Sequence, residues 1–330
     1  MRGFMCLLGS ARSLAVRKVA VLAALCALAF VSAPHAQATD VIVSIKPVHS
    51  LVSGVMGETG EPGLMVTGAA SPHTYQMRPS EAQALNTADL IVWIGENMEM
   101  FLERAIENLG ADAELITLHE VARMELLPTR EGGLWPDEHD EDKEAHVDEH
   151  DDHGHEHGEF DMHIWLDPGN ASRIVEVTAD ALIRSDPGRA EIYRSNADAM
   201  VERIASLEMS IMEQLEPVKQ RAFVVFHDGY QYFEHAFGLN SVGAVAVDPG
   251  RPPGTKRLVE LRAALVEHDI RCVFIEPQFP PDLVQTLTEG TTVRIAELDP
   301  IGVDFEPGPD AWFEMMRSLG DAIAGCLDDA

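Results

Sequence analysis

Short runs of apolar, largely β-branched residues recur along this chain, and each is followed by a helical pattern. The runs fall at residues 41–45, 90–94, 223–226, 242–247, 272–275 and 293–298. Several of them are apolar at consecutive positions, as expected of strands that are buried on both faces of a parallel sheet. Because strands alternate with helices, the pattern predicts an α/β fold.

The middle of the chain interrupts this alternation with a longer helical pattern. Asp186-Pro187 is typical of an N-cap followed by proline at the first helical position. Apolar residues then recur every three or four positions, at Met200, Ile204, Leu207, Ile211 and Leu215. About 30 helical residues would span about 45 Å, which suits a helix that joins two lobes.

These patterns predict a domain organisation. We expect an N-terminal α/β lobe at 39–185 that ends in a separate helix from Pro168 to Ser185, a linking helix at 186–217, and a C-terminal α/β lobe at 218–330. A long surface helix of a single domain is the alternative.

The first 38 residues have the features of a secretory signal peptide. Four basic residues without any acid precede an apolar run at 19–32, and small residues follow up to Ala38, after which we expect cleavage. A retained membrane anchor is the alternative, although the run is shorter than the roughly 20 residues that a bilayer span needs. We therefore expect an exported, soluble product.

The stretch from Asp137 to Asp161 is too polar to be buried in a hydrophobic core. Six of the 14 histidines lie between Asp137 and Asp161 among 13 carboxylates, with Lys143 as the only basic residue. Imidazoles beside carboxylates suit a divalent transition metal such as zinc. We predict weak secondary metal sites in a solvated loop at 137–159, formed by His139, His146, His150, His153, His155 and His157. A disordered acidic loop with incidental histidines is the alternative.

The net charge restricts the possible binding partners, and the number of cysteines bears on a disulfide. Loss of the signal peptide would change the formal charge from −31 to about −35, which argues against nucleic acid and favours cations. Cys272 and Cys326 would then be the remaining cysteines. In an exported protein we expect them to form a disulfide, with two buried free thiols as the alternative.

Three other histidines share a sequence context. His73 in GAASPHTYQ, His163 in DMHIWLDP and His227 in FVVFHDGYQ each lie at or just beyond an apolar segment, near glycine, proline or aspartate. Ligands of open parallel sheets bind beyond the carboxyl ends of the strands. One such histidine is commonly structural, but the recurrence predicts metal ligands. Asp299 in ELDPIG also follows a predicted strand, and it is either a further oxygen ligand or part of an ordinary turn.

At these segments the chain resembles the periplasmic zinc receptors of high-affinity zinc ABC uptake systems, the ZnuA-like members of the family of metal-binding lipoproteins and adhesin receptors. The similarity extends over nearly the whole mature chain, and the acidic loop has the position where zinc members carry theirs. The segments that carry it occur in the family's order: GAASPHTYQMRPSEAQAL, ADLIVWIGENMEMFL, DMHIWLDPGNA, FVVFHDGYQYFEHAFGL, DPGRPPGTKRL, IRCVFIEPQF and RIAELDPIG.

The resemblance implies two lobes with parallel sheets, joined by one long rigid helix, with a metal ion in the cleft between them. His73 and His163 would come from the first lobe and His227 from the second, with Asp299 near the site. The resemblance also implies a Cys272–Cys326 disulfide, Zn²⁺ as the transported ligand, a membrane permease of an ABC transporter as the partner, a periplasmic location and a monomeric receptor without enzymatic activity.

Single positions in these segments bear on which metal is bound and on what its fourth ligand is. Manganese members usually have a carboxylate where this chain has His227, and three imidazoles suit zinc better than manganese. Several zinc members have glutamate immediately before the first histidine, where this chain has Pro72. The fourth ligand is therefore open between Asp299 and water.

Other functions remain as alternatives. A receptor for manganese or another divalent metal, or an adhesin or metal buffer without a transporter, would share most of these features. A zinc hydrolase is less well supported, because the closest approach to H-E-x-x-H begins at His119-Glu120 and ends in Arg123.

Overall fold

The computed structural model describes residues 39–110, 112–130, 134, 159–247, 250 and 253–328. The predicted signal peptide and the six histidines of the predicted acidic loop lie outside these described residues. Among the helices of the described ranges, none is both long and apolar enough to cross a bilayer.

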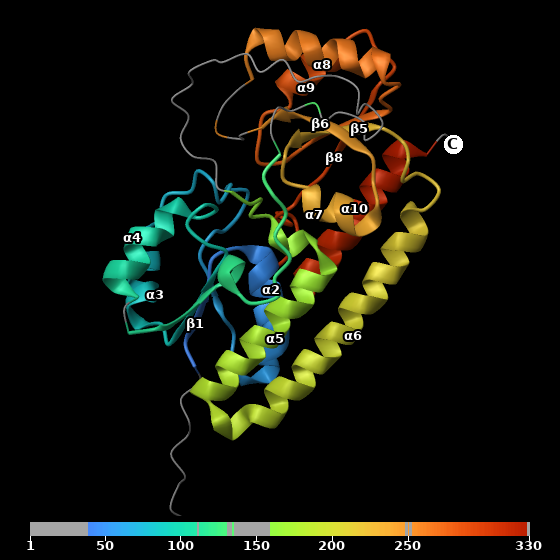
Figure 1. Cartoon of the computed structure of the whole chain (residues 1–330). Coiled ribbons are helices and arrows are strands. Elements are labelled where there is room, and N and C mark those ends of the chain that lie inside the picture. Colours follow the sequence, from blue (N-terminus) through green and yellow to red (C-terminus); the bar gives the residue numbers. More distant parts are fainter. Residues whose placement is uncertain are drawn as a thin grey trace, which may run out of the picture. The chain divides into compact units, whose positions relative to one another are not determined.

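The strands form two parallel four-stranded sheets, which confirms the predicted fold class. The first sheet has the order β2-β1-β3-β4, and the second has the order β6-β5-β7-β8. The strands are β1 (Val41–Val43), β2 (Gly63–Leu64), β3 (Leu90–Trp93), β4 (Glu114–Thr117), β5 (Phe223–His227), β6 (Ser241–Ala246), β7 (Cys272–Ile275) and β8 (Arg294–Glu297). All of the first sheet therefore precedes all of the second in the chain (Figure 1).

Helices connect and cover these strands. The α-helices are α2 (Lys46–Met56), α3 (Pro79–Thr87), α4 (Met100–Leu109), α5 (Pro168–Ser185), α6 (Ala190–Leu215), α7 (Gln231–Phe237), α8 (Thr255–Glu267), α9 (Asp282–Thr288) and α10 (Ala311–Leu327). Short 3₁₀ helices are η1 (Gly57–Thr59), η2 (Leu118–Glu120), η3 (Ile164–Leu166) and η4 (Pro187–Arg189).

The central strands of each sheet are buried on both faces, which explains why they are apolar at consecutive positions. In β1, Val41 and Val43 belong to a large central apolar cluster that includes α2, α5, α6 and α10, whereas Ile42 belongs to a cluster with α3 and α4. In β5, Val225 belongs to the same central cluster, and Val224 belongs to a cluster with α8 and α9. The central cluster thus contains residues of both sheets.

The two predicted helices in the middle of the chain are present. The helix predicted from Pro168 to Ser185 is α5, and the carboxylate of Asp167 caps it by accepting from the amide of Asn170 at 2.6 Å. The long helix starts later than predicted, because η4 occupies its first turn before α6 begins at Ala190. Asp186 does not cap it. Its carboxylate instead binds the guanidinium of Arg189 at 2.7 Å, a charge-assisted contact that replaces the backbone cap.

Helix α6 follows the first sheet and precedes the second in the chain, and it runs beside α5 (Figure 1). Its predicted apolar stripe is buried in the central cluster, at Met200, Ile204, Leu207, Ile211 and Leu215. The lobe boundaries on either side of it stay a prediction.

The predicted disulfide is present between Cys272, at the start of β7, and Cys326 in α10. Their Cα atoms lie 6.2 Å apart, and both side chains are buried. The bond therefore links the amino end of a central strand to the last turn of the C-terminal helix.

Candidate metal centre

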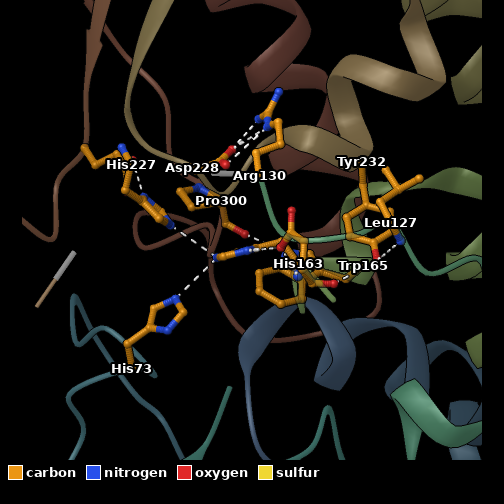
Figure 2. Close-up of polar contacts among 11 residues, drawn as sticks. His73, Leu127, Arg130, His163, Trp165, His227, Asp228, Tyr232 and Pro300 are labelled. Atoms are coloured by element: carbon orange, nitrogen blue, oxygen red, sulfur yellow. Dashed lines mark hydrogen bonds and ion pairs between the residues drawn. The ribbon is translucent and has the colours of Figure 1, made fainter. Parts of the chain in front are cut away.

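Three histidines from distant parts of the chain converge on one point. His73 lies in the loop between β2 and α3, His163 directly precedes η3, and His227 is the last residue of β5. The Nε2 atom of His163 lies 3.3 Å from that of His73 and 3.2 Å from that of His227. The three ligand atoms all lie within 4.8 Å of one another, and Figure 2 shows the rings pointing toward a common centre.

The spacing of these nitrogens fits a tetrahedral metal ion. Ligands at about 2.0–2.1 Å from zinc in a tetrahedral arrangement place neighbouring nitrogens about 3.3 Å apart. The two short Nε2–Nε2 distances have this value. Two of the three ligand separations therefore match a tetrahedral zinc site, and the third lies within 4.8 Å.

Two buried carboxylates orient the histidine rings. Asp161 Oδ1 lies 2.7 Å from Nδ1 of His163, and Glu276 Oε1 lies 2.6 Å from Nδ1 of His227. A carboxylate only accepts hydrogen bonds, so both Nδ1 atoms carry the proton. With the proton of each ring on Nδ1, the Nε2 atoms are left to offer lone pairs toward a common centre, an arrangement that a metal ion stabilises.

Sheet topology explains why His227 and Glu276 meet. Strand β5 pairs with β6 on one side and with β7 on the other. The order of the strands reverses between β5 and β7, and the carboxyl ends at such a point form the usual ligand crevice of an open α/β sheet. His227 ends β5, and Glu276 directly follows β7. Neither Glu276 nor Asp161 was predicted. Asp161 stands two residues before His163 and could have been found from that spacing, whereas Glu276 has no local signal.

The surroundings shift the pKa values of two of the imidazoles in opposite directions. Burial, together with the neighbouring His163 and His227, lowers the pKa of His73 well below its ordinary value. Burial also lowers the pKa of His227, but the Glu276 carboxylate and, more weakly, Asp228 raise it by more, so that the net shift of this pKa is upward. His73 is thus held neutral at pH 7, while His227 retains affinity for a proton when no metal is bound.

Asp299 does not belong to the converging group among the described residues. Its Oδ1 accepts from the amide of Ile301 at 3.1 Å and from the side-chain nitrogen of Gln278 at 2.9 Å, and its Oδ2 accepts from the amide of Val303. The carboxylate thus organises its own loop. Its predicted role as a metal ligand stays a prediction.

The remaining described histidines have other surroundings. His49 is buried, with Nε2 2.9 Å from the carbonyl oxygen of Pro62, whereas His235 and His268 are exposed. His119 is partly buried, and its Nδ1 lies 2.9 Å from the carbonyl oxygen of Ile94.

Comparison with known proteins identifies the family of this chain. A family model described as zinc-uptake complex component A, periplasmic (ZnuA), matches residues 41–326. The chain belongs to the ZnuA family. The predicted family is therefore confirmed.

Individual members of the ZnuA family align over most of their length. The high-affinity zinc uptake system protein ZnuA of Brucella abortus (strain 2308) is 38% identical over 305 residues, which cover 87% of this chain and 91% of that protein. The ZnuA protein of Yersinia pestis is 33% identical over 294 residues, with the same coverage of 87% and 91%. A crystal structure of ZnuA superimposes with a TM-score of 0.71 and 25% identity, and the match covers 88% of this chain and 100% of that one.

Proposed function

We propose that this chain captures Zn²⁺ between His73, His163 and His227 and delivers it to the permease of a zinc-importing ABC transporter. The observation that carries the proposal is the convergence of three imidazoles, two of whose Nε2 atoms lie 3.2 and 3.3 Å from the third. Membership of the ZnuA family supports the transporter and the periplasmic location.

The donor set favours zinc as the cargo. Neutral imidazoles are borderline donors that suit zinc, whereas manganese and magnesium prefer more oxygen. Oδ1 of Asp161 and Oε1 of Glu276 contact Nδ1 of their histidines rather than the Nε2 side where the metal would bind. We infer that water, or Asp299 after a rearrangement of its loop, supplies the fourth ligand.

The remaining parts of the proposal concern the ends and the middle of the chain. We infer that residues 1–38 are removed on export, that the mature receptor is a monomer, and that 39–185 and 218–330 are lobes joined by 186–217. The Cys272–Cys326 disulfide supports export, because such bonds form in oxidising compartments.

Zinc titration of the mature chain tests the site. Changing both His73 and His227 to alanine should weaken the tight site at least 100-fold, measured by competition with a chelator of known affinity. The matched control changes the exposed His235 and His268 to alanine and should alter the affinity less than threefold. Equal effects in the two double variants would refute the assignment.

We further propose that the histidine-rich segment at 137–159 gathers zinc weakly. A variant that lacks these residues should lose the low-affinity zinc equivalents and keep one tight site. Loss of the tight site in that variant would contradict the proposed division of roles.

We propose binding and transfer rather than catalysis. A zinc-bound water on three histidines is also a hydrolytic arrangement, so the metal-loaded protein should be incubated with ester and peptide substrates. We expect no turnover above that of the His73 and His227 double variant.

A further inference from the structure

Arg130 forms a largely buried ion-pair cluster beside the histidines. Its Nε atom lies 3.0 and 3.1 Å from the two carboxylate oxygens of Asp228, Nη2 also contacts Asp228, and Nη1 lies 2.7 Å from Oε2 of Glu234. The side chains of Arg130, Asp228 and Glu234 are 19%, 8% and 7% exposed. A bidentate guanidinium contact of this kind fixes orientation as well as charge.

The position of Arg130 in the chain makes the cluster relevant to the metal. Residues 127–130 run antiparallel to 159–161, with backbone hydrogen bonds from Thr129 to Glu159 at 3.2 Å and from Asp161 to Leu127 at 2.9 Å. This ribbon, defined here as residues 127–130 and 159–161, ends at the carboxylate that holds His163.

The partners of Arg130 lie in the chain segment that begins at the second histidine, His227. Asp228 directly follows His227, and Glu234 lies on α7, the next helix. Arg130 therefore ties the ribbon that leads into His163 to the segment that begins at His227, and Figure 2 shows the Arg130 and Asp228 pair beside the histidines.

A second, uncharged contact joins the same two segments. The hydroxyl of Tyr232 on α7 accepts from the amide of Leu127 at 3.0 Å and donates to the carbonyl oxygen of Asp161 at 2.8 Å. Tyr232 is buried, and its hydroxyl holds both strands of the ribbon. Together with the Arg130 cluster it forms a clasp, defined here as Arg130, Asp228, Tyr232 and Glu234.

We propose that Arg130 is a positioning residue that holds the His163 segment against the His227 segment and thereby slows the release of the metal. The inference rests on the proposed function, because an ion bound by both histidines would link the same two segments. When one metal–nitrogen bond breaks, the clasp keeps the free imidazole at high effective concentration, and the bond re-forms.

A simpler role for Arg130 would be to neutralise two buried carboxylates. Removal of one partner of a buried ion pair leaves an uncompensated charge, which destabilises the fold whatever the metal does. The two roles differ in a variant in which the whole cluster is neutral, Arg130→Met with Asp228→Asn and Glu234→Gln. That variant has no uncompensated charge, yet it lacks the guanidinium that joins the segments.

The test is the rate of zinc release from the mature full-length chain. Protein loaded with one equivalent of zinc is mixed with excess EDTA, and the slow phase of release is followed with a chromogenic chelator present. Arg130→Met and the neutral triple variant should each release zinc at least tenfold faster than the unchanged chain. Tyr232→Phe should do so at least threefold faster, and it tests the clasp independently if Arg130→Met fails to fold.

The controls separate positioning from damage. Arg203→Gln removes the exposed pair between Arg203 and Asp310, whose atoms are not part of the site, and should leave the release rate within twofold. The visible spectrum of the Co²⁺-loaded Arg130→Met variant should keep the bands of the unchanged chain, because the three imidazoles remain. A neutral triple variant that releases zinc at the unchanged rate would overturn the inference, as would altered cobalt bands in Arg130→Met.

The same release experiment distinguishes failure of the proposed function from failure of the clasp. If the unchanged chain showed no slow phase that depends on His73 and His227, zinc would not be held at this centre at all. If that phase were present but insensitive to both the neutral triple variant and Tyr232→Phe, the clasp alone would be refuted.

Discussion

The Nδ1 atom of His227 lies 2.6 Å from Oε1 of Glu276, and the two side chains are 5% and 1% exposed. The same oxygen also lies 3.3 Å from the amide nitrogen of His227. Glu276 thus fixes both the ring orientation and the tautomer of this histidine, with Nε2 left as the donor for a metal ion.

Replacement of Glu276 by glutamine should weaken zinc binding about 10- to 100-fold, the usual effect of losing a partner that orients a metal-binding histidine. Glutamine preserves the shape but removes the charge that makes the imidazole a stronger donor. Chelator competition at pH 8 measures the change. The control is Glu297→Gln in the exposed edge strand β8, for which a comparable loss would contradict the explanation.

Zinc affinity should depend on pH mainly through His227. Its pKa is raised, chiefly by Glu276 acting against burial, so a proton competes with zinc at pH values above the ordinary 6.5 of histidine. The pKa of His73 is lowered, so its competition begins only well below 6.5. We expect the affinity to be constant at high pH and to start falling above pH 6.5 as the pH is lowered.

In Glu276→Gln the onset of this fall should move to lower pH, because the carboxylate that raises the pKa of His227 is absent. In the metal-free chain the raised pKa of His227 adds stability below 6.5, and this contribution is lost as the pH rises through the folded-state value. Zinc dissociation constants measured from about pH 5 to 8.5 locate the onset, and denaturant titration of the metal-free chain over the same range measures the contribution to stability. An onset that is the same in both proteins would show that another group titrates.

Asp299→Asn distinguishes a metal ligand from a residue that organises a loop. The carboxylate accepts from the amides of Ile301 and Val303 and from Gln278, so we expect the variant to lose about 1–2 kcal/mol of stability through weaker hydrogen bonds. The zinc affinity should change less than threefold. A loss of affinity above tenfold without loss of stability would instead make Asp299 the fourth ligand.

Removal of the disulfide should affect stability more than zinc binding. Changing both Cys272 and Cys326 to alanine should cost about 2–4 kcal/mol in the free energy of unfolding, measured by denaturant titration. Cys272 begins β7, whereas Glu276 follows its other end, so the affinity of the folded variant should stay within threefold. A much larger loss of affinity would mean that the bond positions Glu276.

Much of the fold could be predicted because it depends on local patterns. The apolar runs of β1, β3, β5 and β7 reflect burial on both faces, and the helix at Pro168–Ser185 has proline at its first position and Asp167 as its cap. β2 and β4 were missed, because β2 has only two residues and β4 (ELIT) mixes exposed and buried positions. A strand of two residues is too short to show any periodicity, and ELIT has only two consecutive strongly apolar residues.

The sequence by itself indicated the α/β class and the three candidate histidines, because both are marked by recurring local contexts. It indicated the disulfide because Cys272 and Cys326 are the two cysteines that remain in an exported chain. Only the tertiary structure decided which groups surround them. Glu276 meets His227 across 49 positions because β5 pairs with β7, and Arg130 meets Asp228 across 98 positions. Such contacts arise when separate segments pack together, and no local spacing in the chain encodes the distance between them.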